Sequence, residues 1–321
     1  MNLDRDALLA GAGALGFRAE TLEKVVRLLV MLEAIGRDEW VKNRVALKGG
    51  TALNLFLFDV PRLSVDIDLN YIGSPDRMQM RADRPRLEAA IERLVKEHGM
   101  AVARIPDDHA GGKWRLRYDS VLGQLGSIEI DLNYMHRVPL WPVATGDSCT
   151  VAGVTATGVP MVDIHEIVGG KLSALLARRA SRDLFDAHAL LGRSDLDDER
   201  MRIAFVAMGA MNRMDWRKAS VESLGFDAVE IRERLVPLLR TPHAAQKPHD
   251  WADRLLTECR ERLKRVLPLR PSEREFLDRL LDHGDLRPDV LTTDSSLIER
   301  LRVHPLLTWK AQNVRQWMSR G

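Results

Sequence analysis

The chain has 321 residues, of which 45% are hydrophobic and 29% are charged, so it can bury a sizeable core and is not disordered by composition. A chain of this length exceeds one ordinary domain and predicts two domains, or one domain with a large extension. Its 48 basic and 46 acidic side chains leave a net charge of +2, which excludes a global positive field. Any contact with nucleic acid must therefore come from a local patch.

The N-terminal half of the chain mixes helical and strand periodicities. Apolar side chains recur every three or four residues where a helix is expected, and they alternate with polar ones where a half-buried strand is expected. By these criteria we expect helices over residues 18–39, 51–58 and 84–98, and strands over residues 44–48, 64–71, 113–119 and 126–134. Thr51 is the expected N-cap of the second helix, because its hydroxyl can accept from the N–H groups of the first turn.

The C-terminal half is almost entirely helical in pattern, and a turn-rich stretch over residues 137–160 precedes it. Asp163 is the expected cap of a helix that runs to about residue 180. Further helices are expected over residues 182–191, 226–240, 250–266, 272–283 and 305–319, with a linker over residues 241–249. We therefore predict an α+β protein with an N-terminal domain over residues 1–155 and a mainly helical domain over residues 156–321.

Cysteine usage and hydropathy indicate a cytoplasmic protein. Cys149 and Cys259 lie far apart and match no zinc spacing, which is typical of free thiols in a reducing compartment. The longest early apolar stretch, residues 7–17, is interrupted by glycine, follows acidic residues and is too short to cross a membrane. We expect no membrane partner.

The most informative pattern is an acidic face that is repeated on two predicted strands. Polar and apolar side chains alternate strictly in residues 64–71 and 126–134. The polar sets are Ser64, Asp66, Asp68 and Asn70 on the first strand, and Ser127, Glu129, Asp131 and Asn133 on the second. Carboxylates two residues apart on a strand, with Cα atoms roughly 6.5–7 Å apart, repel each other unless a cation lies between them.

A divalent metal ion with oxygen ligands would relieve that repulsion. Mg²⁺, or Mn²⁺ in its place, binds carboxylates and keeps positions for water and substrate phosphate. We therefore predict that Asp66 and Asp68 bind the metal, with Asp131 as the third carboxylate and Glu129 as a near substitute. The alternative is that these acids only face solvent on the outside of a sheet.

A glycine pair precedes the acidic strand. Gly49 and Gly50 join a strand to a short helix, and glycine lets backbone N–H groups approach a phosphate that the helix N-terminus also favours. A strand, a Gly-Gly turn, a helix and then an acidic strand form the layout in which nucleotidyltransferases hold a triphosphate against two metal ions. We expect Gly49, Gly50 and Thr51 to hold the phosphates of an NTP, with Ser64 hydrogen-bonding at the same place.

The third element is a basic segment in the helical half. Lys171, Arg178 and Arg182 have the spacing i, i+7 and i+11, as on one face of a helix. A lysine directed at a metal–phosphate site can balance the charge of the triphosphate. Asp186 follows Asp183 by one turn, so both can face the same cleft. The alternative is an exposed basic helix with an intrahelical Arg–Asp pair.

Three segments of the sequence match the motifs of one family. They are Lys48-Gly-Gly-Thr51, Arg62-Leu-Ser64-Val-Asp66-Ile-Asp68-Leu69, and Lys171 followed by Arg182-Asp183-x-x-Asp186. Together they resemble the AbiEii/AbiGii toxin family of nucleotidyltransferases, which includes the MenT toxins. The resemblance implies a DNA polymerase β-like core with a mixed sheet, and it matches Ser64, Asp66, Asp68, Lys171 and Asp186 to catalytic positions. It also places Lys48 and Arg62 in nucleotide-binding segments.

The resemblance implies a metal-dependent enzyme that transfers NMP from an NTP to an RNA acceptor. For relatives of the MenT type the acceptor is the 3′ end of tRNA, so that transfer blocks translation, and a cognate antitoxin is encoded beside the toxin. In this scheme Lys171 neutralises the triphosphate, while Asp186 orients Lys171 or acts as a base toward the acceptor hydroxyl.

Two groups of side chains suggest where RNA would bind. The basic cluster Arg178, Arg179 and Arg182 is expected to follow the backbone of an acceptor RNA. Trp114, with Arg115 and Arg117 on the same predicted strand, suggests stacking near a single-stranded end, although a tryptophan in a strand more often belongs to the core.

Two other functions fit part of the pattern. A glycosyltransferase with an Asp-x-Asp motif would bind a sugar nucleotide through its metal, but it gives no reason for the glycine pair upstream. A non-catalytic RNA-binding or partner-binding protein could keep a transferase fold, although the intact acidic positions argue against lost catalysis.

Overall fold

The computed structural model describes residues 3–106, 108–240 and 248–319, so residues 241–247 of the expected linker lie outside the described residues. The chain divides into two compact units. The first unit comprises Met1–Arg137, Val143–Val162 and Val236–Gln246, and the second comprises Val138–Pro142, Asp163–Leu235 and Lys247–Gly321. The domain boundary after residue 155 stays a prediction. Within the described ranges, no helix is both long and apolar enough to span a membrane.

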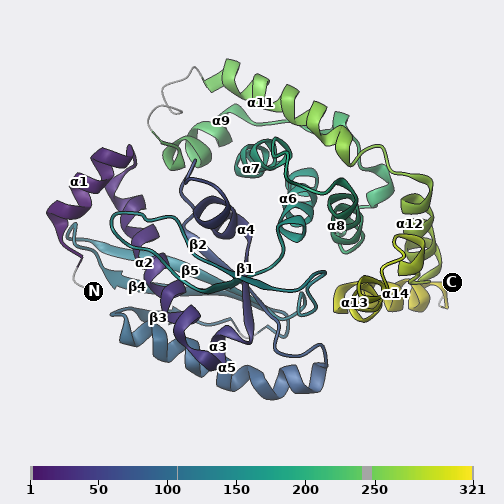
Figure 1. The fold of residues 1–321 in the computed structure, drawn as a ribbon, viewed down its shortest axis with the longest axis horizontal. Helices are drawn as coiled ribbons and strands as arrows, with labels where there is room; N and C mark the ends of the chain where they lie inside the picture. Colours follow the sequence, from purple (N-terminus) through teal and green to yellow (C-terminus); the bar gives the residue numbers. More distant parts are fainter. Residues whose placement is uncertain (1–2, 107, 241–247, 320–321) are drawn as a thin grey trace. The chain divides into compact units, whose positions relative to one another are not determined.

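The first unit contains a mixed β-sheet, which confirms the α+β prediction (Figure 1). Among the described residues seven strands form this sheet, in the order β3-β4-β5-β2-β1-β7-β6. They are β1 (Val45–Lys48), β2 (Asp66–Tyr71), β3 (Ala101–Arg104), β4 (Gly111–Asp119), β5 (Leu125–Asn133), β6 (Ala144–Gly146) and β7 (Val159–Met161). The β2–β5 and β1–β7 pairs are parallel and the other neighbours are antiparallel.

Helices of the first unit lie on both sides of the sheet. They are α1 (Arg5–Leu15), α2 (Ala19–Arg37), α3 (Glu39–Lys42), α4 (Gly49–Ala52) with the π-helical turn η1 (Leu53–Leu57), and α5 (Arg77–Glu97). The Tyr71 hydroxyl at the end of β2 donates to Asp83 of α5 at 2.8 Å, so the apolar face of β2 turns toward α5. Figure 1 shows α5 on one side of the sheet and α4 on the other.

Most predicted elements of the first unit are confirmed with shifted ends. The expected helix over residues 18–39 is α2, and the strands expected at 44–48, 113–119 and 126–134 are β1, β4 and β5. The helix expected from residue 84 begins earlier, at Arg77, because Asp76 caps it by accepting from the Gln79 N–H at 2.8 Å. The first two turns of α5 are mostly polar, so their sequence lacks the apolar periodicity that predicts a helix. The short strands β3, β6 and β7 gave no pattern to detect.

The second unit is helical among the residues that the structure describes. Its longer helices are α6 (Ile164–Arg178), α7 (Ser181–Leu191), α8 (Asp198–Ala210), α11 (Pro248–Arg262), α12 (Pro271–His283), α13 (Ser295–Val303) and α14 (Pro305–Met318). Asp163 caps α6 as predicted, since its carboxylate accepts from the His165 N–H at 2.8 Å. Most of α8 is buried around its whole circumference, so its sequence has no polar stripe and shows no amphipathic periodicity.

One helix prediction is wrong. Residues 226–240 form no single helix but a short α9 (Ala228–Glu230), a π-helical turn η4 (Ile231–Leu235) and a 3₁₀ turn η5 (Val236–Leu238). Proline at position 237 has no N–H to donate and restricts the residue before it, so a regular helix cannot continue through this point.

Candidate active site

The acidic faces of β2 and β5 lie side by side because of the register of the sheet. In the parallel β2–β5 pair Asp68 is opposite Asp131, and neighbouring strands are about 4.8 Å apart. Lys48 of β1 is opposite Asp68, and Lys113 of β4 is opposite Asp131. One row across the sheet therefore reads Lys48, Asp68, Asp131, Lys113, with two carboxylates in the middle and a lysine at each end. We call it the first row.

The two carboxylates in the first row repel each other. Burial raises the pKa of Asp131 above its usual value, and the charge of Asp68 raises it further, while Lys48 and Lys113 act in the opposite direction. A structure that keeps two adjacent carboxylates under this repulsion is suited to binding a cation between them. A bound cation would therefore relieve the repulsion between Asp68 and Asp131.

A second row of charges lies beside the first. Asp66 is opposite Glu129 of β5, and Glu129 is opposite Arg115 of β4. Glu129 is already paired, because Lys113 Nζ lies 3.1 Å from its Oε2 and an Arg115 guanidinium nitrogen lies 3.4 Å from its Oε1. Burial alone would raise the pKa of Glu129, but these hydrogen bonds and charges hold it below its usual value. Among the described residues Asp131 has no such ion pair, so it is the better candidate for a metal ligand.

The carboxylates fit a magnesium site that is completed by substrate. In the part of the chain that the structure describes, no three His, Cys, Asp or Glu side chains form a ready-made metal-binding group. Mg²⁺ usually binds through one or two carboxylates and takes its remaining ligands from water and phosphate. The adjacent pair Asp68 and Asp131 supplies such carboxylates, and Asp66 lies on the same face of β2.

The glycine pair lies directly against this face. Gly49 has a φ of 72°, and a Cβ atom there would lie 2.2 Å from Asp68 Oδ2, so only glycine fits the position. The N-cap prediction for Thr51 is wrong, because α4 begins at Gly49 and Lys48 is its N-cap residue. The buried Thr51 hydroxyl instead donates to the Asp66 carbonyl oxygen at 2.5 Å. This bond ties the glycine turn to the acidic strand.

Arg62 and Ser64 lie just before β2, which begins at Asp66 rather than at the expected residue 64. Both side chains are buried. Arg62 forms an antiparallel bridge with Leu239, and its guanidinium donates to the Leu63 carbonyl at 2.9 Å. These contacts anchor the segment that leads into the acidic strand. The nucleotide contacts of Arg62 and Ser64 stay predictions.

In the second unit, Lys171 of α6 meets two aspartates of α7. Its Nζ lies 2.6 Å from Asp186 Oδ2 and 3.4 Å from Asp183 Oδ1, and both aspartates are 1% exposed. The chain turns between the helices at Arg179, which has a left-handed φ of 54°. Lys171 is thus held by two buried carboxylates, a geometry that fixes the position of its ammonium group.

Asp183 also belongs to this cluster, although it was not among the residues predicted to be catalytic. Arg178 also binds it, with Nε 2.6 Å from Oδ2 and a second guanidinium nitrogen 3.1 Å from Oδ1. Asp183 precedes Asp186 by three residues, a spacing that puts both side chains on one face of a helix and indicates that both can contact Lys171. The prediction that Arg182 shares one continuous helix face with Lys171 and Arg178 is wrong, because α6 ends at Arg178 and α7 begins at Ser181.

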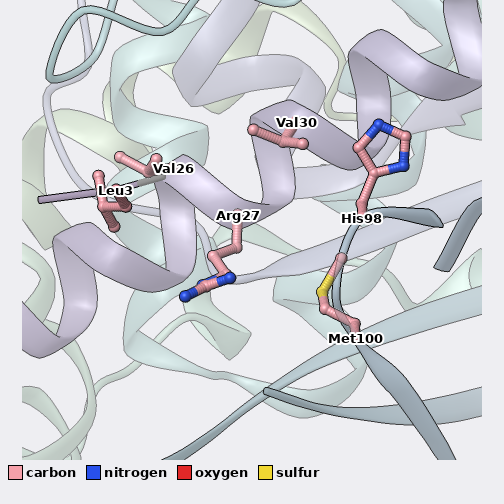
Figure 2. A pocket seen from close by; sticks show the side chains of 6 residues that line it. All are labelled: Leu3, Val26, Arg27, Val30, His98 and Met100. Atoms are coloured by element: carbon pink, nitrogen blue, oxygen red, sulfur yellow. The ribbon is translucent and has the colours of Figure 1, made fainter. Parts of the chain in front are cut away.

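Two other features do not belong to the acidic face. Trp114 is 2% exposed, so the alternative that it belongs to the core is confirmed. A hollow in the first unit lies on the other face of the sheet, where Arg27 of α2 stacks over the Tyr118 ring at 4.5 Å. Its lining residues are Leu3, Val26, Arg27, Val30, His98 and Met100 (Figure 2).

Comparisons with known proteins identify the family and the fold. The family model described as nucleotidyl transferase AbiEii toxin, type IV TA system, matches residues 32–290. The solved structure of MenT4, a nucleotidyltransferase toxin from Mycobacterium tuberculosis H37Rv, is similar in fold, with a TM-score of 0.59 and 17% identity over 94% of this chain and 99% of that chain. The search of the curated proteins found no match. Since the family model covers most of the chain, the resemblance in the motifs is confirmed, and the protein belongs to the AbiEii family of nucleotidyltransferase toxins.

Proposed function

We propose that this protein transfers NMP from an NTP to the 3′ end of an RNA acceptor, with tRNA as the acceptor and Mg²⁺ as the metal ion. The observation that carries the proposal is the adjacent pair Asp68 and Asp131, with Gly49 packed against Asp68. Carboxylates can hold a cation and backbone N–H groups can hold a phosphate, so the two together suit a metal–nucleotide complex. Family membership favours this reading over a glycosyltransferase.

The residues of the first unit have distinct roles in this proposal. Asp66, Asp68 and Asp131 hold the metal, which when bound neutralises phosphate charge and activates the acceptor hydroxyl. The N–H groups of Gly49 and Gly50 hold the phosphates, with Lys48 adding positive charge at the same row of the sheet. Thr51 keeps the turn and the strand in register through its bond to the Asp66 carbonyl.

The residues of the second unit match catalytic positions of the family, and their roles rest on that match. Lys171 neutralises the triphosphate as a compact charge, and Asp186 holds its ammonium group at 2.6 Å. We add Asp183 as a second positioning residue, since it contacts both Lys171 and Arg178. Arg179 and Arg182 stay candidates for contacts with RNA.

The biological role follows from the family. As a toxin of a type IV system, the protein is expected to have a cognate antitoxin as its partner. Addition of nucleotides to the 3′ end of tRNA would prevent aminoacylation and so block translation in the cytoplasm.

Incubation with total tRNA, Mg²⁺ and each labelled NTP, followed by sequencing of the tRNA 3′ ends, tests the proposal. We expect added nucleotides with the wild-type protein and none with Asp66→Ala. The matched control is Glu20→Ala, which removes an exposed carboxylate of α2. Labelling by a folded Asp66→Ala protein, or no labelling of any tRNA by the wild type, would contradict the assignment.

A further inference from the structure

The outward face of β4 and its neighbour β3 carries four cations. Side chains of β4 alternate, so that Trp114, Leu116 and Tyr118 are buried and the residues between them are exposed. The exposed set on β4 is Lys113, Arg115, Arg117 and, at the end of the strand, Asp119; Arg104 of β3 is exposed as well. The side chains of Lys113 and Arg115 remain 54% and 56% exposed even though both contact Glu129.

Register makes these cations one strip that continues the acidic face. Arg104 of β3 is opposite Arg115 of β4, and opposite residues of paired strands point to the same side of a sheet. Arg115 is in turn opposite Glu129, which is opposite Asp66. A path along this row therefore passes from Asp66, through the ion-paired Glu129 and Arg115, to Arg104 on the outermost strand.

The outer two cations differ from the inner two. Lys113 and Arg115 are partly neutralised by Glu129. Arg117 is opposite Ser127 on β5 and Ala101 on β3, so neither cross-strand neighbour offers it a carboxylate, and the acid nearest along the strand on this face is Asp119. In the described part of the chain no acidic side chain forms an ion pair with Arg104 or Arg117. The strip thus presents its free positive charge on the side away from the metal-binding carboxylates.

Protection of a sheet edge does not explain this strip. Charged side chains on an edge strand prevent unwanted strand pairing, and this accounts for Arg104, because β3 is at one end of the sheet. It does not account for Lys113, Arg115 and Arg117, because β4 is paired on both sides. The exposed charges of β3 and β4 are four cations and one carboxylate, Asp119, whereas a face that only contacts solvent would mix the two signs more evenly.

We propose that this strip, formed by Arg104, Lys113, Arg115 and Arg117, binds the sugar–phosphate backbone of the acceptor RNA and leads its 3′ end to the carboxylates. The proposal rests on the proposed function and names the surface that its acceptor uses. The strip offers cations without an aromatic ring, since Trp114 and Tyr118 turn to the core. It therefore contacts phosphates and positions the RNA without reading its bases.

The test compares two charge-reversed proteins in tRNA binding without NTP. Arg104→Glu/Arg117→Glu changes only the outer cations, which contact none of the carboxylates proposed to bind metal. Arg77→Glu/Arg81→Glu is the matched control, because it reverses two exposed arginines of α5. Affinity is measured by fluorescence anisotropy across a series of KCl concentrations, and thermal unfolding shows that each protein is folded. If charge reversal prevents folding, Arg104→Gln/Arg117→Gln replaces it.

We expect weaker tRNA binding by the strip variant, and a plot of log K against log salt whose slope is smaller by about 1.4–1.8, as the loss of two phosphate contacts predicts. The control should keep the wild-type slope. An unchanged slope in the strip variant overturns the inference, and if that variant still transfers nucleotides the proposed function stands. Loss of antitoxin binding with unchanged tRNA binding would make the strip a protein interface and would also overturn it. A wild-type protein that binds no tRNA overturns both.

Discussion

The acidic face of the first unit and the Lys171 cluster of the second unit use charge in opposite ways. On the sheet, Asp68 and Asp131 are adjacent like charges that remain partly exposed, and the nearest cations lie at the ends of their row. In the helical unit, Lys171 lies 2.6 Å from the buried Asp186, and each charge has an opposite partner. The carboxylates of the sheet are suited to binding a cation, whereas those of the helical unit already bind the ammonium group of Lys171. Removal of a charge should therefore cost activity but not stability in the first unit, and stability as well as activity in the second.

The largest effect is expected from loss of Lys171. Lys171→Met would leave Asp183 and Asp186 buried with one cation fewer, and a buried charge that loses its partner destabilises a protein by about 3–5 kcal/mol. Urea unfolding measures this change in the free energy of unfolding. The double variant Lys171→Met/Asp186→Asn should recover part of the loss, because it also removes the buried negative charge that Lys171 had balanced. A Lys171→Met protein as stable as the wild type would contradict the claim that the charges of the helical unit stabilise the fold.

A carboxylate of the sheet should show the reverse behaviour. We expect Asp68→Asn to lower the rate of nucleotide transfer by about 10²–10³-fold, since it weakens the binding of the metal ion that would stabilise the charge at the reacting phosphate. The same change relieves repulsion with Asp131, so the free energy of unfolding should stay equal or rise. Labelling of tRNA and urea unfolding, measured on the same preparation, check both halves. A strongly destabilised Asp68→Asn protein would show that the carboxylate is structural.

Asp131 and Glu129 allow a sharper version of this test within one strand. Asp131→Asn should reduce transfer by about tenfold or more, as expected for a group near the metal, whereas Glu129→Gln should change it only a few-fold. The reason is that Lys113 and Arg115 already hold Glu129. Initial rates of transfer at saturating NTP compare the two variants. Equal losses in both would remove the distinction that the ion pairs predict.

The smallest effect concerns the helix that carries Lys171. Burial would raise the pKa of Asp163, but bonds from His165 and the charge of Arg200 hold it below its usual value. A carboxylate with a lowered pKa stabilises the fold above its unfolded pKa of about 3.9, and this contribution is lost as the pH falls through the folded value. Asp163→Ala should cost about 1 kcal/mol at neutral pH, with a cost that shrinks in acid. A cost that does not change with pH would contradict this account of the cap.

Local patterns predicted much of the fold and of the candidate site. The alternation in β2 and β5 showed that Asp66, Asp68 and Asp131 share a face, because strand periodicity depends only on neighbours in sequence. The pairing of Asp68 with Asp131, and of Glu129 with Arg115, could not be predicted, since register between distant strands depends on the whole sheet.

The predictions for Thr51 and Arg182 were wrong because the backbone near these residues leaves regular helical geometry. Gly49 adopts a left-handed conformation and begins α4 earlier than Thr51 would, although Thr51 is the better capping residue by type. Arg179 also has a left-handed φ, which separates α6 from α7 at a residue that rarely adopts it. That turn places Asp183 beside Lys171, and no helical projection through residue 182 could have shown the contact.

Binding of Mn²⁺ in place of Mg²⁺ tests the central claim most directly, and electron paramagnetic resonance measures it without any catalytic turnover. With NTP present, we expect the wild-type protein and Glu129→Gln to bind the ion with similar affinity. The double variant Asp68→Asn/Asp131→Asn should lose that binding while remaining folded by circular dichroism. Wild-type Mn²⁺ affinity in the folded double variant would contradict the claim that these two carboxylates form the metal site.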